Sequence, residues 1–301
     1  MNSLNAFAYD VNDFLKTVSK KSTESDITLH NRKDGENVYT FLTPTRFPDK
    51  VSALTDCIYP SDLALVNGNS LTRDLGEVII ALDLMGVKRG YFFVDDESKI
   101  DQLKPIISKT SLKDYKFYSG NHMEFLDILS KEKHVPRFSK PTIILDHFFK
   151  VKSVGTVALG FVLGGRVEKH QKLMCSYANK EAQIRSIQVQ DEDQEAAESG
   201  TRVGLALKNI DAEEIERGMF MTEGSFDYLT DFQGKFEFHP AVKATDDPSF
   251  EIFVSDQMRY QRGVADKGKF TLEKPIVKIK NELVVATPNK TPRIQGKIRF
   301  P

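Results

Sequence analysis

Hydrophobic positions up to residue 130 follow two periods that alternate along the chain. In segment 75–85, apolar residues recur at intervals of three and four, the spacing of an amphipathic helix, and Gly86 follows where that helix would end. Asp34-Gly35 separates two strand-like runs and indicates a β-hairpin. We expect strands at 5–9, 27–31, 38–43, 63–66, 91–94 and 115–118, and helices at 75–85, 100–107 and 123–129. This alternation predicts a mostly parallel sheet with helices on both faces.

The pattern changes at 131–141, a charged segment with prolines that is typical of a connector between domains. Beyond it, short apolar runs and four glycines between 155 and 165 favour β-barrels, whose strands often kink or approach closely at glycine. One short helical turn is expected where Asp211 can cap, Glu214 can reach back and Gly218 ends the turn. We expect strands at 142–145, 156–163, 182–189, 203–207, 250–254, 276–279 and 283–286.

These changes of pattern predict three domains. Residues 1–135 form an α/β domain, and the β-rich remainder is divided into a β-barrel at 136–225 and a second β-barrel at 226–301. The division is made because about 160 residues are too many for one small barrel.

Composition excludes several classes of protein. The 301 residues include 42 Lys and Arg against 43 Asp and Glu, so no basic field covers the whole chain. No apolar run approaches the ~20 residues that span a bilayer, and the N-terminus lacks a secretory signal, so we expect no membrane association. Cys57 and Cys175 lie far apart and match no zinc spacing, which makes the cytoplasm the expected compartment. The histidines form no metal-binding spacing, and no catalytic residue or metal ligand is predicted.

Residues 263–270, GVADKGKF, differ by one position from the phosphate-binding loop G-x-x-x-x-G-K-[ST]. Phe270 cannot supply the hydroxyl that contacts Mg²⁺, and the residues after it begin a strand rather than a helix. A phosphate loop follows a strand and opens a helix, so this match is interpreted as a turn.

Four blocks in the second half carry a resemblance to a known family. They are Gly155-Thr156-Val157 after a Phe-containing strand, a glycine-bearing loop before Val167, the tetrapeptide at 184–187, and 203–207 followed by 215–218. In this order they resemble the second, β-barrel domain of translational GTPases, in particular elongation factor Tu and the selenocysteine factor SelB. The tail 272–300 resembles the closing strands of the third domain. The resemblance implies that residues 1–135 are a shortened GTPase-like, P-loop NTPase-type α/β domain, followed by two β-barrels.

The nucleotide motifs of that family are only partly present. In the segment after the first strand, Lys16 and Thr17 match the end of the phosphate loop, but Asp10 and Leu15 replace its two glycines. A Cβ blocks the close approach of backbone to phosphate, and a carboxylate repels it. Thr28 resembles the threonine of the first switch that contacts Mg²⁺.

Two further motifs are degenerate. The D-x-P-G-H segment falls at 42–46, where its Asp, Gly and His are absent, and the guanine-reading N-K-x-D falls at 95–98 without its Asn and Lys. We therefore expect no GTPase activity, and GTP and Mg²⁺ as cofactors only if the chain is a divergent active enzyme.

The resemblance also implies a pocket on the first barrel for the aminoacyl end of tRNA. By position its residues are Asp146, His147, Phe149, Gln188, Gln190 and Lys208. His147 replaces a carboxylate of elongation factor Tu, and Lys208-Asn209 replaces an Arg-Gly pair, so the amino-acid specificity is open. From the residues alone, Phe149 fits barrel core equally well, and His147 and Lys208 fit an ordinary surface.

Three functions are left open by the sequence. The first is a monomeric translation-associated binding protein without GTPase activity, whose partner is tRNA, the ribosome or another factor. The second is a divergent GTPase that delivers aminoacyl-tRNA to the ribosome. The third is a scaffold whose barrels make only protein contacts.

Overall fold

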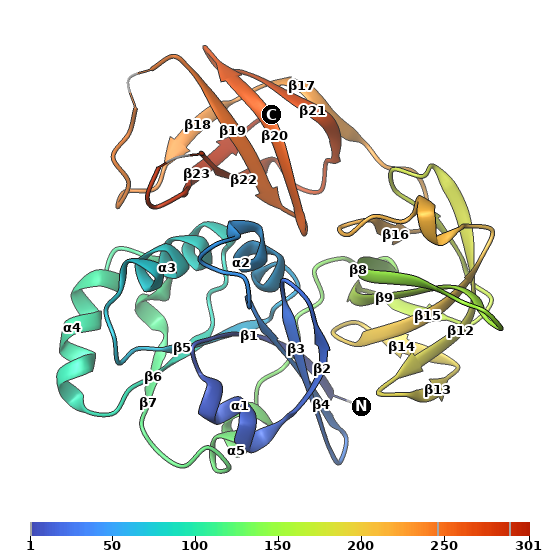
Figure 1. Ribbon diagram of the computed structural model, residues 1–301, viewed down its shortest axis with the longest axis horizontal. Helices are drawn as coiled ribbons and strands as arrows, with labels where there is room; N and C mark the ends of the chain where they lie inside the picture. The colour runs from blue at the N-terminus through green and yellow to red at the C-terminus, as the bar shows by residue number, and fades with distance from the viewer. Residues whose placement is uncertain (1, 246, 289) are drawn as a thin grey trace. The chain divides into compact units, whose positions relative to one another are not determined.

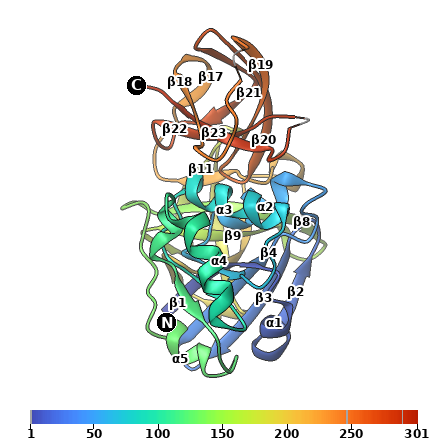
Figure 2. The same ribbon diagram turned by 90° about the vertical axis from the view of Figure 1, so that its left-hand side faces the viewer.

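The computed structural model describes residues 2–245, 247–288 and 290–301 (Figure 1). Figure 2 shows the same ribbon from the side. The chain forms two compact units, and each is built from separate stretches of sequence. The first unit comprises Met1–Asn5, His30–Phe41 and Phe125–Phe226, and the second comprises Ala6–Leu29, Leu42–Glu124 and Asp227–Pro301.

The N-terminal region contains one seven-stranded sheet. Its strands are β1 (Asn2–Tyr9), β2 (Lys20–Glu24), β3 (Thr28–Asp34), β4 (Asn37–Thr43), β5 (Leu63–Asn67), β6 (Gly90–Phe93) and β7 (Lys116–Tyr118). They lie in the order β2-β3-β4-β1-β5-β6-β7. The last four in this order are parallel neighbours, with Phe7 opposite Ala64 and Val66 opposite Phe92. The carboxyl ends of β1, β5, β6 and β7 therefore meet at one edge of the sheet.

Five α-helices and one 3₁₀-helix accompany this sheet. They are α1 (Asn12–Val18), α2 (Val51–Ile58), α3 (Arg73–Met85), α4 (Glu97–Ile107), η1 (Ser111–Asp114) and α5 (Phe125–Leu129). In the second unit, α1 lies on one face of the sheet and α2 and α3 on the other (Figure 1). At the start of α3, the Thr72 side chain accepts a hydrogen bond from the Leu75 N–H, and Gly86 ends the helix with φ 73°.

Helices α1 and α2 are elements that the sequence pattern did not predict. All eight residues of α2 are buried. Its apolar residues Val51, Leu54 and Ile58 do recur at intervals of three and four, but the helix has only eight residues, and so short a window does not distinguish a helix from a buried strand.

Residues 142–222 form a closed β-barrel with a two-stranded addition. Its strands are β8 (Thr142–Val151), β9 (Gly155–Gly164), β10 (Arg166–Glu168), β11 (Lys172–Cys175), β12 (Lys180–Val189), β13 (Glu192–Gln194), β14 (Ala196–Glu198), β15 (Arg202–Lys208) and β16 (Phe220–Thr222), with η2 (Ala212–Glu214) after β15. The order β11-β16-β8-β9-β15-β12-β13 closes because β11 also pairs with β12. A Cβ on Gly160 would come within 2.4 Å of the Ile144 carbonyl oxygen, so this close approach requires glycine. Asp211 and Glu214 form the predicted capping box.

Residues 228–299 form the third sheet, which is also curved like a barrel. Its strands are β17 (Tyr228–Gln233), β18 (Lys235–Phe238), β19 (Ser249–Asp256), β20 (Arg259–Asp266), β21 (Lys269–Val277), β22 (Glu282–Ala286) and β23 (Ile294–Arg299), in the order β17-β21-β20-β19-β22-β23-β18. The near-motif 263–270 is the β20–β21 hairpin, with its turn at Lys267 and Gly268 (φ 49° and 83°). Gly263 lies inside β20 rather than in a loop.

The structure confirms the predicted fold class, an α/β region followed by two β-barrel regions. The expected strand at 276–279 was placed too late, because β21 spans Lys269–Val277. The domain boundaries at 135 and 225 stay predictions. Within the described part of the chain, no helix combines the length and apolar character needed to cross a membrane.

Inside the second unit, α2 and α3 pack against the third sheet through buried polar groups. The Glu77 carboxylate of α3 is 4% exposed and accepts hydrogen bonds from the N–H groups of Arg293 and Ile294, at 2.6 and 3.1 Å. The Arg293 guanidinium lies 2.9 Å from the same carboxylate. The His239 ring and the Asp83 carboxylate make a second contact, a hydrogen bond of 3.0 Å.

Replacement of Glu77 by alanine should lower the free energy of unfolding by about 3 kcal/mol, because two backbone N–H groups and the guanidinium lose a buried partner. Urea denaturation of the Glu77→Ala variant measures this loss. The matched control is Glu97→Ala, which removes an exposed carboxylate from α4. Equal stability of the two variants would show that the Glu77 contacts contribute nothing.

Candidate functional site

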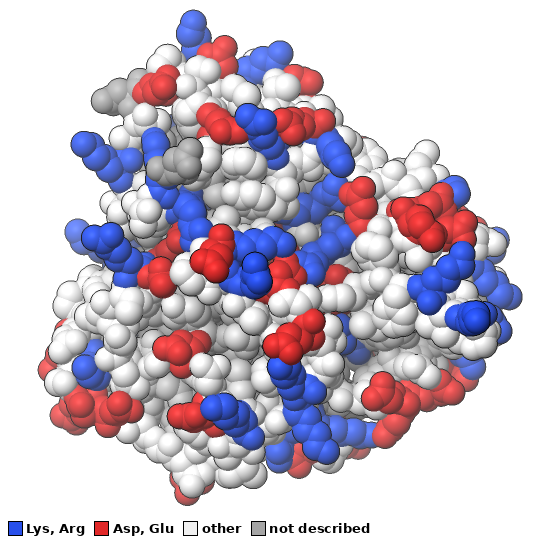
Figure 3. All heavy atoms as spheres, in the orientation of Figure 1, with Lys and Arg blue, Asp and Glu red and all other residues white. Residues whose placement is uncertain are grey.

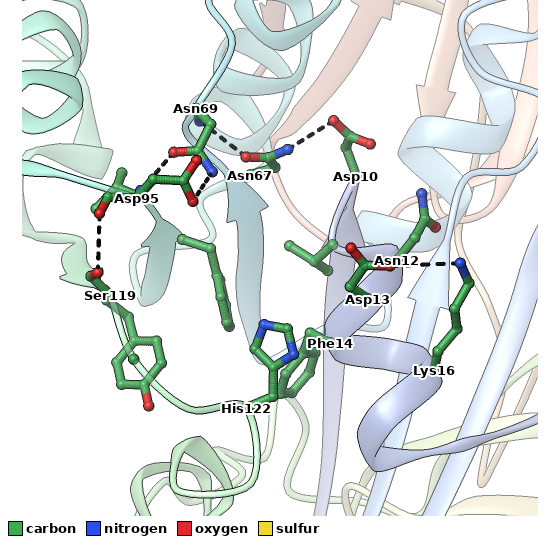
Figure 4. Close-up of a pocket in the computed structure, with 15 residues that line it drawn as sticks. Asp10, Asn12, Asp13, Phe14, Lys16, Asn67, Asn69, Asp95, Ser119 and His122 are labelled. Carbon is green, nitrogen blue, oxygen red and sulfur yellow. Dashed lines mark hydrogen bonds and ion pairs between the residues drawn. The ribbon is translucent and has the colours of Figure 1, made fainter.

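A cavity of about 660 Å³ lies at the edge where the four parallel strands end (Figure 4). Its lining comes from the segments directly after β1, β5, β6 and β7 and from α1. The residues are Asp10, Val11, Asn12, Asp13, Phe14, Lys16, Asn67, Asn69, Phe93, Val94, Asp95, Tyr118, Ser119, Gly120 and His122. In open parallel sheets, ligands bind outside the carboxyl ends of the strands, so this cavity is the candidate site of the α/β region.

A chain of hydrogen bonds joins the strand ends across the cavity (Figure 4). The Asn67 side-chain amide donates to the Asp10 carboxylate at 3.0 Å, and the Asn67 side-chain oxygen accepts from the Asn69 N–H at 3.0 Å. The Asn69 side chain donates to the Asp95 carboxylate at 3.1 Å and accepts from the Asp95 N–H at 2.7 Å. The two carboxylates are thus held in fixed positions, with one oxygen of each outside this chain.

An aromatic cluster lies beside the cavity. Phe14 and Phe93 are buried, and their ring centroids lie 5.3 Å apart. His122 meets Phe14 edge-on at 5.7 Å, and Tyr118 meets Phe93 edge-on at 5.6 Å. The cavity surface is therefore mostly polar, with exposed carboxylates and half-buried amides, and the aromatic cluster packs beside it.

Lys16 and Thr17 lie in the last turns of α1 and are exposed. The Lys16 ammonium is 3.6 Å from the Asp13 carboxylate, and the Thr17 hydroxyl donates to the Asp13 carbonyl oxygen at 2.7 Å. Thr28 is buried at the start of β3, where its hydroxyl is bonded to that of Thr45. Of these three predicted nucleotide contacts, Lys16 lines the cavity, and all three stay predictions.

Only Asp10 and Val11 connect β1 to α1. A phosphate loop needs several consecutive backbone N–H groups that wrap around the phosphates, and two residues cannot form such a loop. Asp10 itself has φ 55°, a left-handed conformation that Asp and Asn tolerate better than most residues. Among residues 2–245, 247–288 and 290–301, no group of three or more His, Cys, Asp or Glu could hold a metal ion.

The second site predicted from the sequence lies on the outside of the first barrel. Strand pairing places His147 opposite Leu159, Leu159 opposite Gly204, and Gly204 opposite Gln188. Directly opposed residues of antiparallel strands point to the same face of the sheet. His147 and Gln188 thus share one row across four strands, and Asp193 continues the row on β13, where the Gln188 side chain donates to its carboxylate at 2.9 Å.

Phe149 and Lys208 extend this outer face. Phe149 lies two residues after His147, and Lys208 lies four residues after Gly204, so period-two alternation puts both on the same side. Phe149 is 46% exposed, so it is not barrel core. Gln190 stands apart, in the turn after β12, with φ 51°.

Asp146 does not join this face, because its side chain is fully buried. Its carboxylate lies 3.0 Å from the Arg202 guanidinium and 3.2 Å from the His147 ring. Burial alone would raise the pKa of Asp146, but the Arg202 charge and the hydrogen bonds from His147 and Arg202 outweigh it and hold the pKa at about 2. Asp146 therefore positions His147 and Arg202 rather than facing a ligand.

Sequence reasoning did not single out Asn67, Asn69, His122 or Arg202. Asn67 directly follows a predicted strand, and Asn69 comes two residues later. Because strand ends meet at one edge of a parallel sheet, this position could have indicated that both side chains belong to a site there. For His122 and Arg202 the sequence carries no such signal.

Comparison with known proteins gives a consistent relationship. Residues 155–222 match the family model of Elongation factor Tu domain 2. An uncharacterized protein of Methanocaldococcus jannaschii is 38% identical over 247 residues, which cover 80% of this chain and 80% of that protein. The selenocysteine-specific elongation factor of the same organism is 37% identical over 97 residues, but these are 32% of this chain and only 20% of that factor.

Among solved structures, apo translation elongation factor SelB from Methanococcus maripaludis covers 100% of this chain with a TM-score of 0.81. The match spans 80% of the SelB chain at 18% identity. Sequence similarity to the selenocysteine-specific factor of Methanocaldococcus jannaschii is thus local, whereas similarity of fold to SelB extends over the whole chain.

The Asp146 pKa gives a prediction for acid stability. A carboxyl group whose pKa falls on folding contributes stability above its ordinary pKa, near 3.8, and this contribution is lost as pH falls toward 2. We expect Asp146→Asn to lower the free energy of unfolding by about 2 kcal/mol at pH 7 and by much less near pH 2. Urea denaturation of both proteins across this range measures the difference. Asp193→Asn, an exposed control, should show no such convergence, and a constant difference for Asp146→Asn would contradict the assignment.

Proposed function

Because the chain belongs to the translational GTPase family, together with elongation factor Tu and SelB, we propose that it is a translation-associated binding protein without GTPase activity. Its partner is tRNA, the ribosome or another translation factor, and it acts in the cytoplasm as a monomer. The observation that carries the proposal is the two-residue connection between β1 and α1. The GTPases of this family hold their nucleotide by a loop at this position, and the connection is too short to supply one.

Electrostatics supports the absence of a nucleotide. Asp10, Asp13 and Asp95 line the cavity, and the ammonium of Lys16 is already paired with Asp13. A triphosphate there would face a net negative charge, and it would need Mg²⁺ without a loop to hold the complex. The alternative, a divergent GTPase that delivers aminoacyl-tRNA, draws its support from Lys16, which lines the same cavity.

The outer face of the first barrel supports an RNA ligand. An exposed Phe149 ring can stack on a base or on an aminoacyl group, and Lys208 can pair with a phosphate. On the surface in Figure 3, acidic and basic side chains are interspersed rather than gathered by sign. RNA binding therefore depends on a few local contacts, not on a broad basic field.

Titration with a fluorescent GTP analogue tests the loss of nucleotide binding. We expect no Mg²⁺-dependent binding in the micromolar range, with an active translational GTPase as the positive control for the assay. Micromolar binding that disappears in Lys16→Ala would establish the divergent GTPase instead.

Filter binding with charged and uncharged tRNA tests the barrel face. Phe149→Ala should weaken binding of charged tRNA by roughly tenfold, because a stacked ring contributes about 1–3 kcal/mol. Phe148→Ala is the matched control, since Phe148 is also partly exposed but points to the other side of β8. Lys208→Gln should reduce the salt dependence of binding. If neither tRNA binds, tRNA is excluded as the partner, and the ribosome or another factor is left.

A further inference from the structure

The cavity at the strand ends has the size of a ligand site. Its volume of about 660 Å³ lies within the ~300–1,000 Å³ of typical small-molecule pockets. Its lining is mostly polar, and the half-buried rings of Tyr118 and His122 contribute apolar surface, whereas Phe14 and Phe93 lie buried beside them.

The excess of negative charge around the cavity favours a positively charged ligand. Three carboxylates, Asp10, Asp13 and Asp95, face one ammonium, that of Lys16, which Asp13 already neutralises. The carboxylates of Asp10 and Asp95 remain. Hydrogen bonds from the Asn67 and Asn69 side chains hold them in place. Because each amide donates to only one carboxylate oxygen, the second oxygen of Asp10 and of Asp95 can accept a further hydrogen bond.

A bare metal ion does not suit this arrangement, because the described residues offer no group of three metal-binding side chains. A phosphate does not suit it either, because the net charge is negative and the two residues between β1 and α1 cannot form a phosphate loop. An ammonium or guanidinium group suits both the carboxylates and the aromatic rings of the site. It can donate charge-assisted hydrogen bonds to the second oxygens of Asp10 and Asp95. The alkyl chain of the ligand, or the flat face of a guanidinium group, can pack on the aromatic rings.

We propose that this cavity binds an organic cation that carries an ammonium or guanidinium group, with Asp10 and Asp95 as its anionic contacts and the half-buried rings of Tyr118 and His122 as its apolar contacts. This inference does not require tRNA binding. It assigns a ligand to the cavity at the carboxyl ends of the parallel strands, where the proposed function expects no nucleotide.

Calorimetric titration with agmatine, which has a guanidinium and an ammonium group, tests the proposal. We expect saturable binding that weakens by roughly tenfold or more in Asp95→Asn and in Asp10→Asn, because each change removes a charge-assisted hydrogen bond. Asn is suited to both positions, since it can still accept from the neighbouring amide and tolerates the positive φ of Asp10. Asp101→Asn, which removes an exposed charge from α4, should bind agmatine like the parent protein.

NMR signals of the His122 and Tyr118 rings should shift on binding, which places the ligand in this cavity. A short arginine-containing peptide forms a second arm of the experiment. Tighter binding of the peptide identifies a partner's side chain as the source of the cation, and tighter binding of agmatine identifies a free amine. Absence of saturable binding in both arms, or equal affinity of Asp95→Asn and Asp101→Asn, would overturn the proposal.

Failure of this inference is distinguishable from failure of the proposed function. Displacement of agmatine by GTP would oppose both the cation site and the loss of nucleotide binding. Absence of tRNA binding would affect only the proposed function.

Discussion

The connection of two residues between β1 and α1 is the constraint on which the α/β region depends. With only Asp10 and Val11 available, the chain turns directly from strand into helix, and Asp10 takes a positive φ to make the turn. No backbone is left over to surround a phosphate. The space at the edge of the sheet is instead crossed by the side chains of Asn67 and Asn69, which hold Asp10 and Asp95 from neighbouring strands. A site that could accept an anion thus becomes one that attracts a cation.

The first barrel is subject to a different constraint, the close approach of its strands. Added Cβ atoms at Gly160 and Gly164 would lie 2.4 and 2.3 Å from backbone carbonyl oxygens, and the surrounding core is buried on all sides. These requirements are steric and do not depend on any ligand. One of these glycines, Gly164, belongs to a block that resembles translational GTPases, the glycine-bearing loop before Val167.

Buried polar groups hold the second unit together. Glu77 and Asp83 on α3 meet Arg293 and His239 of the third sheet, and Thr55 on α2 is hydrogen-bonded to Ser255 on β19 at 2.7 Å. Each group has a partner, so its burial does not leave an uncompensated charge or dipole. These contacts are made on the face of the sheet that carries α2 and α3, and they are separate from the cavity at the strand ends.

The sequence alone determined the alternating elements of the first 130 residues, the hairpin at Asp34-Gly35, the barrel strands and the loss of the loop glycines, because periodicity and turn chemistry are properties of neighbouring residues. It did not predict α1, α2 or β2, which have seven, eight and five residues and therefore offer too short a window for a period to be recognised. It also could not bring Asn69 to Asp95, 26 residues away, or Arg202 to Asp146, 56 residues away. Those contacts depend on which strands are neighbours and in what register, and only the folded chain decides this, since many strand orders are compatible with the same local pattern.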